Sequence, residues 1–211
     1  DNYNLHNPEY RSFVKFFATG SLKEFLKTVP AIARFGIRRT VQASACGQTE
    51  FPDSVFFAGR ELQPELRSLQ TELKKIISPD ALVATIDVHT GLGKRGEELL
   101  ILDGKVGDAE EKFYTDTFRT ALVKPGKTRG TYRASGSLGE LFQRHWKQSF
   151  HIFQEMGTYP VWKTLLALIH KDPAEMLETY FPADERWRET CLRNGLLRFD
   201  QLARHLGHEM T

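Results

Sequence analysis

The chain lacks several features that would assign it to a class. It has no apolar run near the ~20 residues of a membrane-spanning helix, so the sequence predicts no membrane span. Its two cysteines, Cys46 and Cys191, lie far apart and form no C-x-x-C pair. This excludes a disulfide framework and a zinc knuckle, and predicts reduced thiols. A net charge of +2, with only small basic pairs and no interleaved aromatics, gives no support for a nucleic-acid partner.

What remains is the composition of an ordinary globular protein. Hydrophobic residues make up 40% of the 211 residues and charged residues 27%, which is enough to build one core. The first residue is Asp rather than Met, and no signal-peptide pattern follows it. We therefore expect a single domain over residues 1–211 in the cytoplasm or, as the alternative, in an organelle matrix after a presequence has been removed.

Apolar periodicity predicts an alternation of helices and strands. Expected helices cover 9–18, 21–46, 61–77, 108–122, 138–146, 162–170, 173–180 and 184–206, and expected strands lie near 55–58, 81–86, 98–102 and 149–155. Strands alternating with helices indicate an α/β protein, here with a partial parallel or mixed sheet flanked by helices.

The segment 81–93, A-L-V-A-T-I-D-V-H-T-G-L-G, is the most informative one. Its apolar start has the β-branched content of a buried strand, and Asp87 and His89 follow before a turn with two glycines. Buried strands of α/β proteins commonly present working residues at their carboxyl ends, and a neutral imidazole there can bind a metal. A hydrogen-bonded histidine at a strand end is the other interpretation.

A second segment, S-F-H-I-F-Q-E-M-G-T-Y-P at 149–160, has the same design. A short apolar strand leads to Glu155, which is followed by Gly157 and a Tyr-Pro turn. A carboxylate fixed at a strand end suits general-base catalysis. We expect Glu155 and His89 to lie close together on neighbouring strands, although a surface glutamate at a strand–loop junction remains the alternative for this second segment taken alone.

Together, D-V-H-T-G-L-G at 87–93 and Q-E-M-G-T-Y-P at 154–160 resemble a family of zinc-carboxypeptidase-like proteins of unknown function. That family stands near the carboxypeptidase A and succinylglutamate desuccinylase/aspartoacylase superfamily. F-P-D-S-V-F-F-A-G-R at 51–60 and Y-F-P-A-D-E-R-W-R-E-T-C-L-R-N-G-L at 180–196 extend the resemblance over most of the chain. It implies the C-terminal part of a zinc-carboxypeptidase-like fold, with about half of its sheet.

The resemblance also implies residue roles. His89 matches the distal zinc ligand, and Glu155 matches the glutamate that activates the zinc-bound water. Asp87 is expected to lie near His89 and to support this ligand without binding the zinc itself. In the loop K-P-G-K-T-R-G-T-Y-R, Arg129 or Arg133 is expected to hold a substrate carboxylate and Tyr132 to cover the site, with a basic surface loop as the alternative.

The remaining two zinc ligands of the family come from a His-x-x-Glu motif early in the fold. Here the spacing occurs only as H-N-P-E, with His6 and Glu9, in a segment with no preceding strand to present it. We interpret it as a chance match, because ligand geometry needs a scaffold. The sequence therefore predicts that the chain alone holds no zinc with complete protein ligation.

Two functions follow from this sequence. The first is a carboxypeptidase-like protein that is inactive or incomplete as this chain and serves as a fragment or subunit of a larger assembly. The alternative is a zinc-dependent hydrolase of peptide or acyl-amino-acid amide bonds, completed by an N-terminal segment outside this chain. In both cases the expected partner is the missing N-terminal portion or another protein subunit, because a partial sheet leaves an edge that must be covered.

Overall fold

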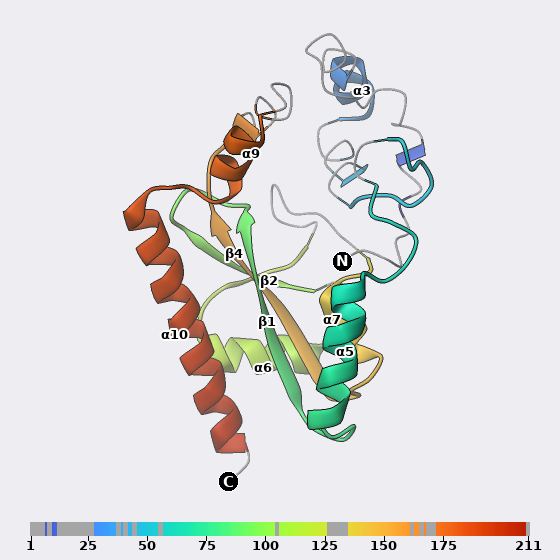
Figure 1. The fold of residues 1–211 in the computed structure, drawn as a ribbon. Coiled ribbons are helices and arrows are strands. Elements are labelled where there is room, and N and C mark those ends of the chain that lie inside the picture. Colours follow the sequence, from blue (N-terminus) through green and yellow to red (C-terminus); the bar gives the residue numbers. More distant parts are fainter. Residues whose placement is uncertain are drawn as a thin grey trace. The chain divides into compact units, whose positions relative to one another are not determined.

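A computed structural model gives the fold of the chain (Figure 1). The residues it describes are 7, 10–11, 28–36, 39, 42–43, 46–54, 57–103, 106–125, 135–160, 163–164, 167 and 172–209. The chain divides into two compact units, each described by itself below. The first comprises Asp1–Val83 with Tyr132–Ser149, and the second Ala84–Thr131 with Phe150–Thr211.

The second unit is built on a four-stranded sheet in the order β1-β4-β2-β3. The strands are β1 (Val83–Gly91), β2 (Glu98–Leu102), β3 (Leu122–Val123) and β4 (Ser149–Gly157). Strand β2 runs antiparallel to β4, with Leu100 opposite Gln154, and parallel to β3. The sheet is therefore mixed, and β4 lies in its interior.

Strands β1 and β4 run in the same direction (Figure 1). Near their starts Thr85 contacts His151, and further along both strands His89 approaches Glu155. Residues four positions further along β1 thus contact residues four positions further along β4. This arrangement places the polar residues of both strands side by side.

The core of this unit lies where the sheet meets α6 (Asp108–Phe118) and α10 (Glu185–Glu209). The buried side chains that form it are Leu100, Leu102, Tyr114, Phe118, Ile152 and Leu202. Helix α6 is followed by its capping residue Arg119, whose φ of 49° is left-handed, so the chain turns there and enters β3. The sequence predicted a helix as far as residue 122 and missed this short strand.

Helix α9 (Pro173–Tyr180), also in this unit, has a clear start signal. The carboxylate of Asp172 accepts hydrogen bonds from the backbone N–H groups of Ala174 and Glu175, and Pro173 occupies the first turn. These groups satisfy N–H donors that have no partner within the helix. The predicted helix at 173–180 is confirmed at both ends.

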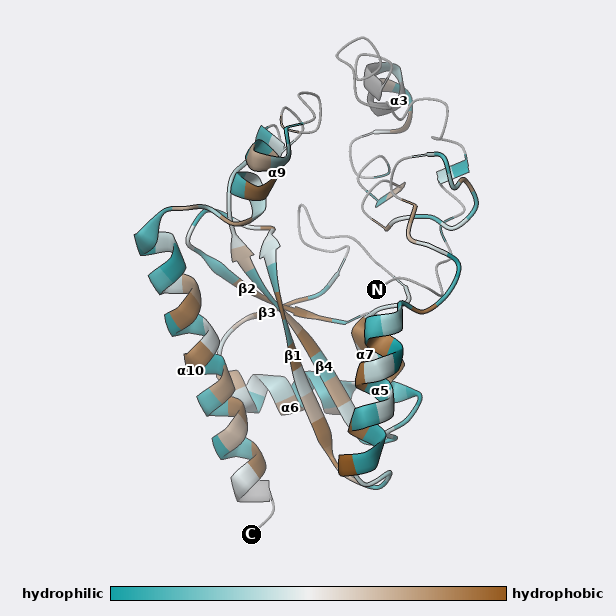
Figure 2. Cartoon of the chain, viewed as in Figure 1, coloured by the Kyte–Doolittle hydropathy of each residue, from teal (hydrophilic) through white to brown (hydrophobic). Residues whose placement is uncertain are grey.

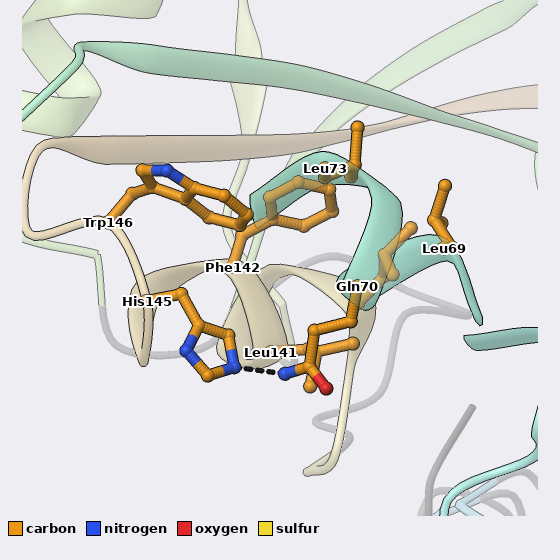
Figure 3. A pocket seen from close by; sticks show the side chains of 8 residues that line it. Leu69, Gln70, Leu73, Leu141, Phe142, His145 and Trp146 are labelled. Atoms are coloured by element: carbon orange, nitrogen blue, oxygen red, sulfur yellow. Dashed lines mark hydrogen bonds between the residues drawn. The ribbon is translucent and has the colours of Figure 1, made fainter. Parts of the chain in front are cut away.

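The first unit contains α3 (Thr28–Phe35), α5 (Pro64–Ile76) and α7 (Leu138–Gln143). Its described apolar cluster joins Val83, Phe142 and Trp146 to partly buried residues such as Leu73. A small cavity lies between α5 and α7, where Gln70 reaches His145 (Figure 3). At about 10 Å³ the cavity is at the lower limit for a single water molecule, so we do not assign it a ligand.

The structure confirms the α/β class, with a mixed four-stranded sheet flanked by helices. One boundary differs in a way that matters for function. Strand β1 continues to Gly91, so Asp87 and His89 lie within the strand rather than after it. None of the described helices is long and apolar enough to cross a membrane. Helix α10 instead shows polar and apolar residues interleaved along its length (Figure 2).

Helix α10 is tied to the sheet by an ion pair that is nearly removed from solvent. The Arg198 guanidinium donates from Nε to Glu98 Oε2 at 3.0 Å, and the two side chains are 13% and 10% exposed. Gln154 donates to the other carboxylate oxygen of Glu98. Removing one member of a buried pair leaves an uncompensated charge, which is strongly destabilising.

We therefore expect Arg198→Met to lower the free energy of unfolding by about 3 kcal/mol. The control is Arg204→Met on the same helix, because Arg204 and its partner Asp200 are 75% and 51% exposed. That exposed pair contributes less than about 1 kcal/mol. Urea unfolding followed by circular dichroism measures both variants, and equal losses would contradict the assigned role of the Arg198–Glu98 pair.

Candidate functional site

The candidate site consists of two facing rows of side chains on β1 and β4. Alternate residues of a strand share one face of the sheet. Residues 85, 87 and 89 of β1 therefore form one row, and residues 151, 153 and 155 of β4 form the other. These residues are Thr85, Asp87, His89, His151, Phe153 and Glu155.

Glu155 is the buried carboxylate of the site, with 7% of the residue exposed. Burial raises the pKa of Glu155, and the nearby charge of Asp87 raises it further. Opposing this, the backbone N–H of Leu92 donates to Glu155 Oε2 at 3.3 Å and His89 supplies positive charge. The balance favours a carboxyl that takes up a proton more readily than an exposed glutamate does.

The turn after β1 explains why Glu155 is enclosed. A Cβ at Gly157 would lie 2.0 Å from the backbone oxygen of Lys94, so only glycine fits at that position. The backbone of Gly157 also exchanges hydrogen bonds with this turn, donating to Glu97 and accepting from Gly96. The turn is therefore held against the end of β4, where Leu92 reaches the carboxylate.

His89 lies between two carboxylates. Its Nε2 is 3.1 Å from Asp87 Oδ1, and its Nδ1 is 3.9 Å from Glu155 Oε1. The hydrogen bond to Asp87 raises the pKa of His89, and the charges of Asp87 and Glu155 add to this effect against the opposing cost of burial. The distance to Glu155 confirms the expectation that these two side chains lie together.

Asp87 occupies the middle of the network. Burial opposes its ionisation, but the hydrogen bond from His89 and the charges of His89 and His151 outweigh burial and lower the pKa of Asp87. The carboxylate is 23% exposed. Asp87 is therefore the group of the site that holds a negative charge most firmly.

His151 was not identified from the sequence. It is 1% exposed, its Nδ1 lies 2.6 Å from Thr85 Oγ1, and its Nε2 lies 3.9 Å from Asp87 Oδ2. Burial lowers the pKa of His151 to about 4, so the ring is neutral near pH 7. The spacing His151-x-Phe153-x-Glu155 in the sequence was the available signal, because it places His151 on the face of Glu155.

Tyr180 at the end of α9 is a second residue missed by the sequence analysis. A Cβ at Gly91 would lie 3.5 Å from Tyr180 Cε1, so the phenol ring lies against the end of β1. Burial raises the pKa of Tyr180, and the negative charge of Glu155 raises it further. The phenol is thus a neutral hydrogen-bond donor near the carboxylate.

A zinc centre has a minimum number of protein ligands. A structural zinc site needs four ligands, and a catalytic site needs three from the protein. Among the described residues, no group of three His, Cys, Asp or Glu side chains has the geometry to hold a metal ion. The site as described does not fit a complete zinc centre. His6, Glu9, Arg129, Tyr132 and Arg133 lie outside the described residues.

Most of the chain matches one family of proteins. A family model described as "protein of unknown function (DUF2817)" matches residues 2–194, so the chain belongs to that family. No curated protein and no solved structure matches the chain. The matched range includes every member of the two facing rows.

The raised pKa of Glu155 predicts a pH-dependent cost in stability. Because the folded state binds this proton more tightly, ionisation of Glu155 destabilises the fold as pH rises past the ordinary glutamate pKa of about 4.3. We expect Glu155→Gln to raise the Tm at pH 7 by roughly 2–4 °C, which corresponds to about 1 kcal/mol in a chain of this size.

The Tm advantage of Glu155→Gln should disappear below about pH 4, where the wild-type carboxyl is protonated in both states. Glu97→Gln is the control, because Glu97 is 56% exposed and lies in the adjacent turn. Calorimetric scans between about pH 3.5 and 8 provide the measurement. A gain for Glu155→Gln that is constant across this range would contradict the assigned burial cost.

A second prediction concerns the pair of Asp87 and His89. Asp87→Asn removes the charge that helps to raise the pKa of His89, so this pKa should fall toward or below the ordinary value of about 6.5. An NMR titration of the imidazole protons in chelator-treated protein measures the change. Asp116→Asn removes an exposed carboxylate elsewhere in the unit and should leave the titration of His89 unaltered. An unchanged His89 in Asp87→Asn would show that the pair does not form.

Proposed function

We propose that the chain is a carboxypeptidase-like protein that carries the acid–base half of an amide-hydrolase centre and serves as a fragment or subunit of a larger assembly. The observation that carries this proposal is the placement of His89 between Asp87 and Glu155. One nitrogen of His89 is held by Asp87, and the other faces a buried carboxylate with a raised pKa.

This arrangement assigns a task to each side chain. Glu155 is the general base. A carboxyl whose pKa is raised toward neutrality can both accept a proton and later release it, which suits general acid–base catalysis. Asp87 fixes the ring of His89 by accepting from Nε2, as carboxylates do behind ligating or catalytic histidines. Tyr180 can donate a hydrogen bond to an oxygen held near Glu155.

The assembly part of the proposal is supported by the surface of α10. Leu192, Leu196 and Phe199 follow one another at i, i+4 and i+7, and are 65%, 61% and 67% exposed. Residues at this spacing lie along one face of a helix. Contiguous exposed apolar side chains mark surfaces that contact other polypeptides.

The second candidate is a zinc-dependent hydrolase of peptide or acyl-amino-acid amide bonds whose remaining ligands come from a segment outside this chain. The orientation of His89 favours it, because Asp87 engages Nε2 and leaves Nδ1 turned toward Glu155. Carboxylate–histidine pairs of this kind are the usual support of metal ligands. Since the described residues do not complete the centre, no catalytic step is assigned through a metal.

Zinc titration and an amidase assay on the same preparation test the proposal. We expect the metal-free chain to bind no equivalent of zinc in competition with a chelator. We also expect it to hydrolyse a panel of dipeptides and N-acyl amino acids no faster than Glu155→Gln does. The physical reason is that one imidazole cannot hold zinc tightly without further ligands.

One tightly bound zinc per chain, together with hydrolysis that is abolished in Glu155→Gln, would overturn the first candidate and show that this chain supplies the zinc ligands itself. His89→Ala should then lose the zinc, whereas His205→Ala on α10 should keep it. His205 is a suitable control because its ring packs against Phe113, away from the two rows.

A further inference from the structure

His151 is a buried polar side chain to which the proposed function assigns no task. It lies within β4 and is 1% exposed. Its Nε2 is buried and has no hydrogen-bond partner among the described residues. The same atom lies 3.9 Å from Asp87 Oδ2, and buried imidazole nitrogens are normally paired.

The neighbours of His151 define which nitrogen carries its proton. Thr85 Oγ1 lies 2.6 Å from His151 Nδ1 and 3.3 Å from the carbonyl oxygen of Phe150. The Thr85 hydroxyl has one hydrogen, which it can donate either to that carbonyl oxygen or to Nδ1. The charge of Asp87 selects between the two, because it favours a proton on the nitrogen that faces it. When Thr85 donates to Nδ1, the ring proton lies on Nε2, which faces Asp87. The opposite tautomer would turn a lone pair toward a carboxylate.

With this tautomer, Asp87 is shared between two imidazoles. Oδ1 accepts from His89 Nε2 at 3.1 Å, and Oδ2 faces His151 Nε2. Closing the 3.9 Å gap to a hydrogen bond requires a shift of roughly 1 Å, since such bonds are about 2.9 Å long. A carboxylate held at both oxygens has one orientation and presents one geometry to His89.

Phe153 separates the two imidazoles. Its ring lies edge-on to both, with centroids 5.2 Å from His89 and 4.9 Å from His151. The polar link between the two histidines therefore runs through Asp87. Apart from the direct charge interaction between the two rings, an influence of His151 on His89 passes through that carboxylate or through the packing of Phe153, and these two routes can be separated by substitution.

We propose that His151 is a positioning residue of this site. It donates from Nε2 to Asp87 Oδ2 and fixes the carboxylate, so that Asp87 holds the Nε2–H tautomer of His89 with the Nδ1 lone pair toward Glu155. This inference deepens the proposed function and rests on it for the chemical task of His89. The hydrogen-bond arrangement itself is tested without any activity.

The test is NMR of the full chain labelled with ¹⁵N at histidine, without metal, at a pH where both rings are neutral. Imidazole ¹⁵N shifts identify the protonated nitrogen directly. We expect the proton of His151 on Nε2 and that of His89 on Nε2. A wild-type His151 that carries its proton on Nδ1 overturns the inference, whatever the variants show.

Three variants separate positioning from packing. His151→Phe keeps a ring but removes the donor, so His89 should become a mixture of tautomers. His151→Gln places an amide donor near the same point and should keep the Nε2–H form of His89. Phe153→Leu changes the packing against both rings and should leave the tautomer of His89 unaltered. If His151→Phe does not fold, the wild type and His151→Gln decide the question.

Two results from these variants would overturn the inference. One is an unchanged tautomer of His89 in His151→Phe, and the other is an equal loss of the Nε2–H form of His89 in Phe153→Leu. Activity is a separate readout. If the chain hydrolyses amides, His151→Phe should lower kcat by about 10–100-fold with little change in KM, as removal of a supporting hydrogen bond does. If the wild type has no activity, as the proposed function expects of this chain by itself, the tautomers still decide the role of His151.

Discussion

The side-by-side pairing of β1 and β4 in one direction is the constraint on which the site depends. A strand presents every second side chain to the same face, so two neighbouring strands in matched register present two parallel rows. Thr85 meets His151 and His89 meets Glu155 for this reason. A slip of one residue in either strand would turn that row to the opposite face. The strand pairing is thus a condition for the proposed chemistry as well as for the fold.

Four ionisable groups in two adjacent strands carry a desolvation cost. The structure offsets this cost by favouring the charged form of two groups and the neutral form of the other two. The pKa of Asp87 is lowered and that of His89 is raised, because each stabilises the charged form of the other. Burial moves the outer members toward neutrality: it raises the pKa of Glu155 and lowers that of His151. The network therefore has a charged centre, with two buried groups at its ends that resist ionisation.

The sequence was sufficient to predict those features that depend on local pattern. The positions of β1 and β4 could be predicted from apolar runs that end in polar residues. Because both segments share this sequence pattern, we expected His89 and Glu155 to lie close together. The short β3 was missed, because a two-residue strand has no periodicity and exists only through its pairing with β2. His151 was missed because a histidine among apolar residues has the pattern of a core position. Its relation to Asp87 depends on strand register, which a single sequence does not specify.

The charges of the site also limit what can approach it. Asp87 remains negative, and Glu155 gains a second negative charge only against burial and against the field of Asp87. The groups that favour this second charge are the N–H of Leu92 and the ring of His89. A proton donor, a polarised water or a cation near His89 Nδ1 would relieve this imbalance, whereas another carboxylate would increase it. If the substrate is an acyl-amino acid, its terminal carboxylate must therefore be bound by basic side chains away from Asp87 and Glu155, while its amide bond reaches them.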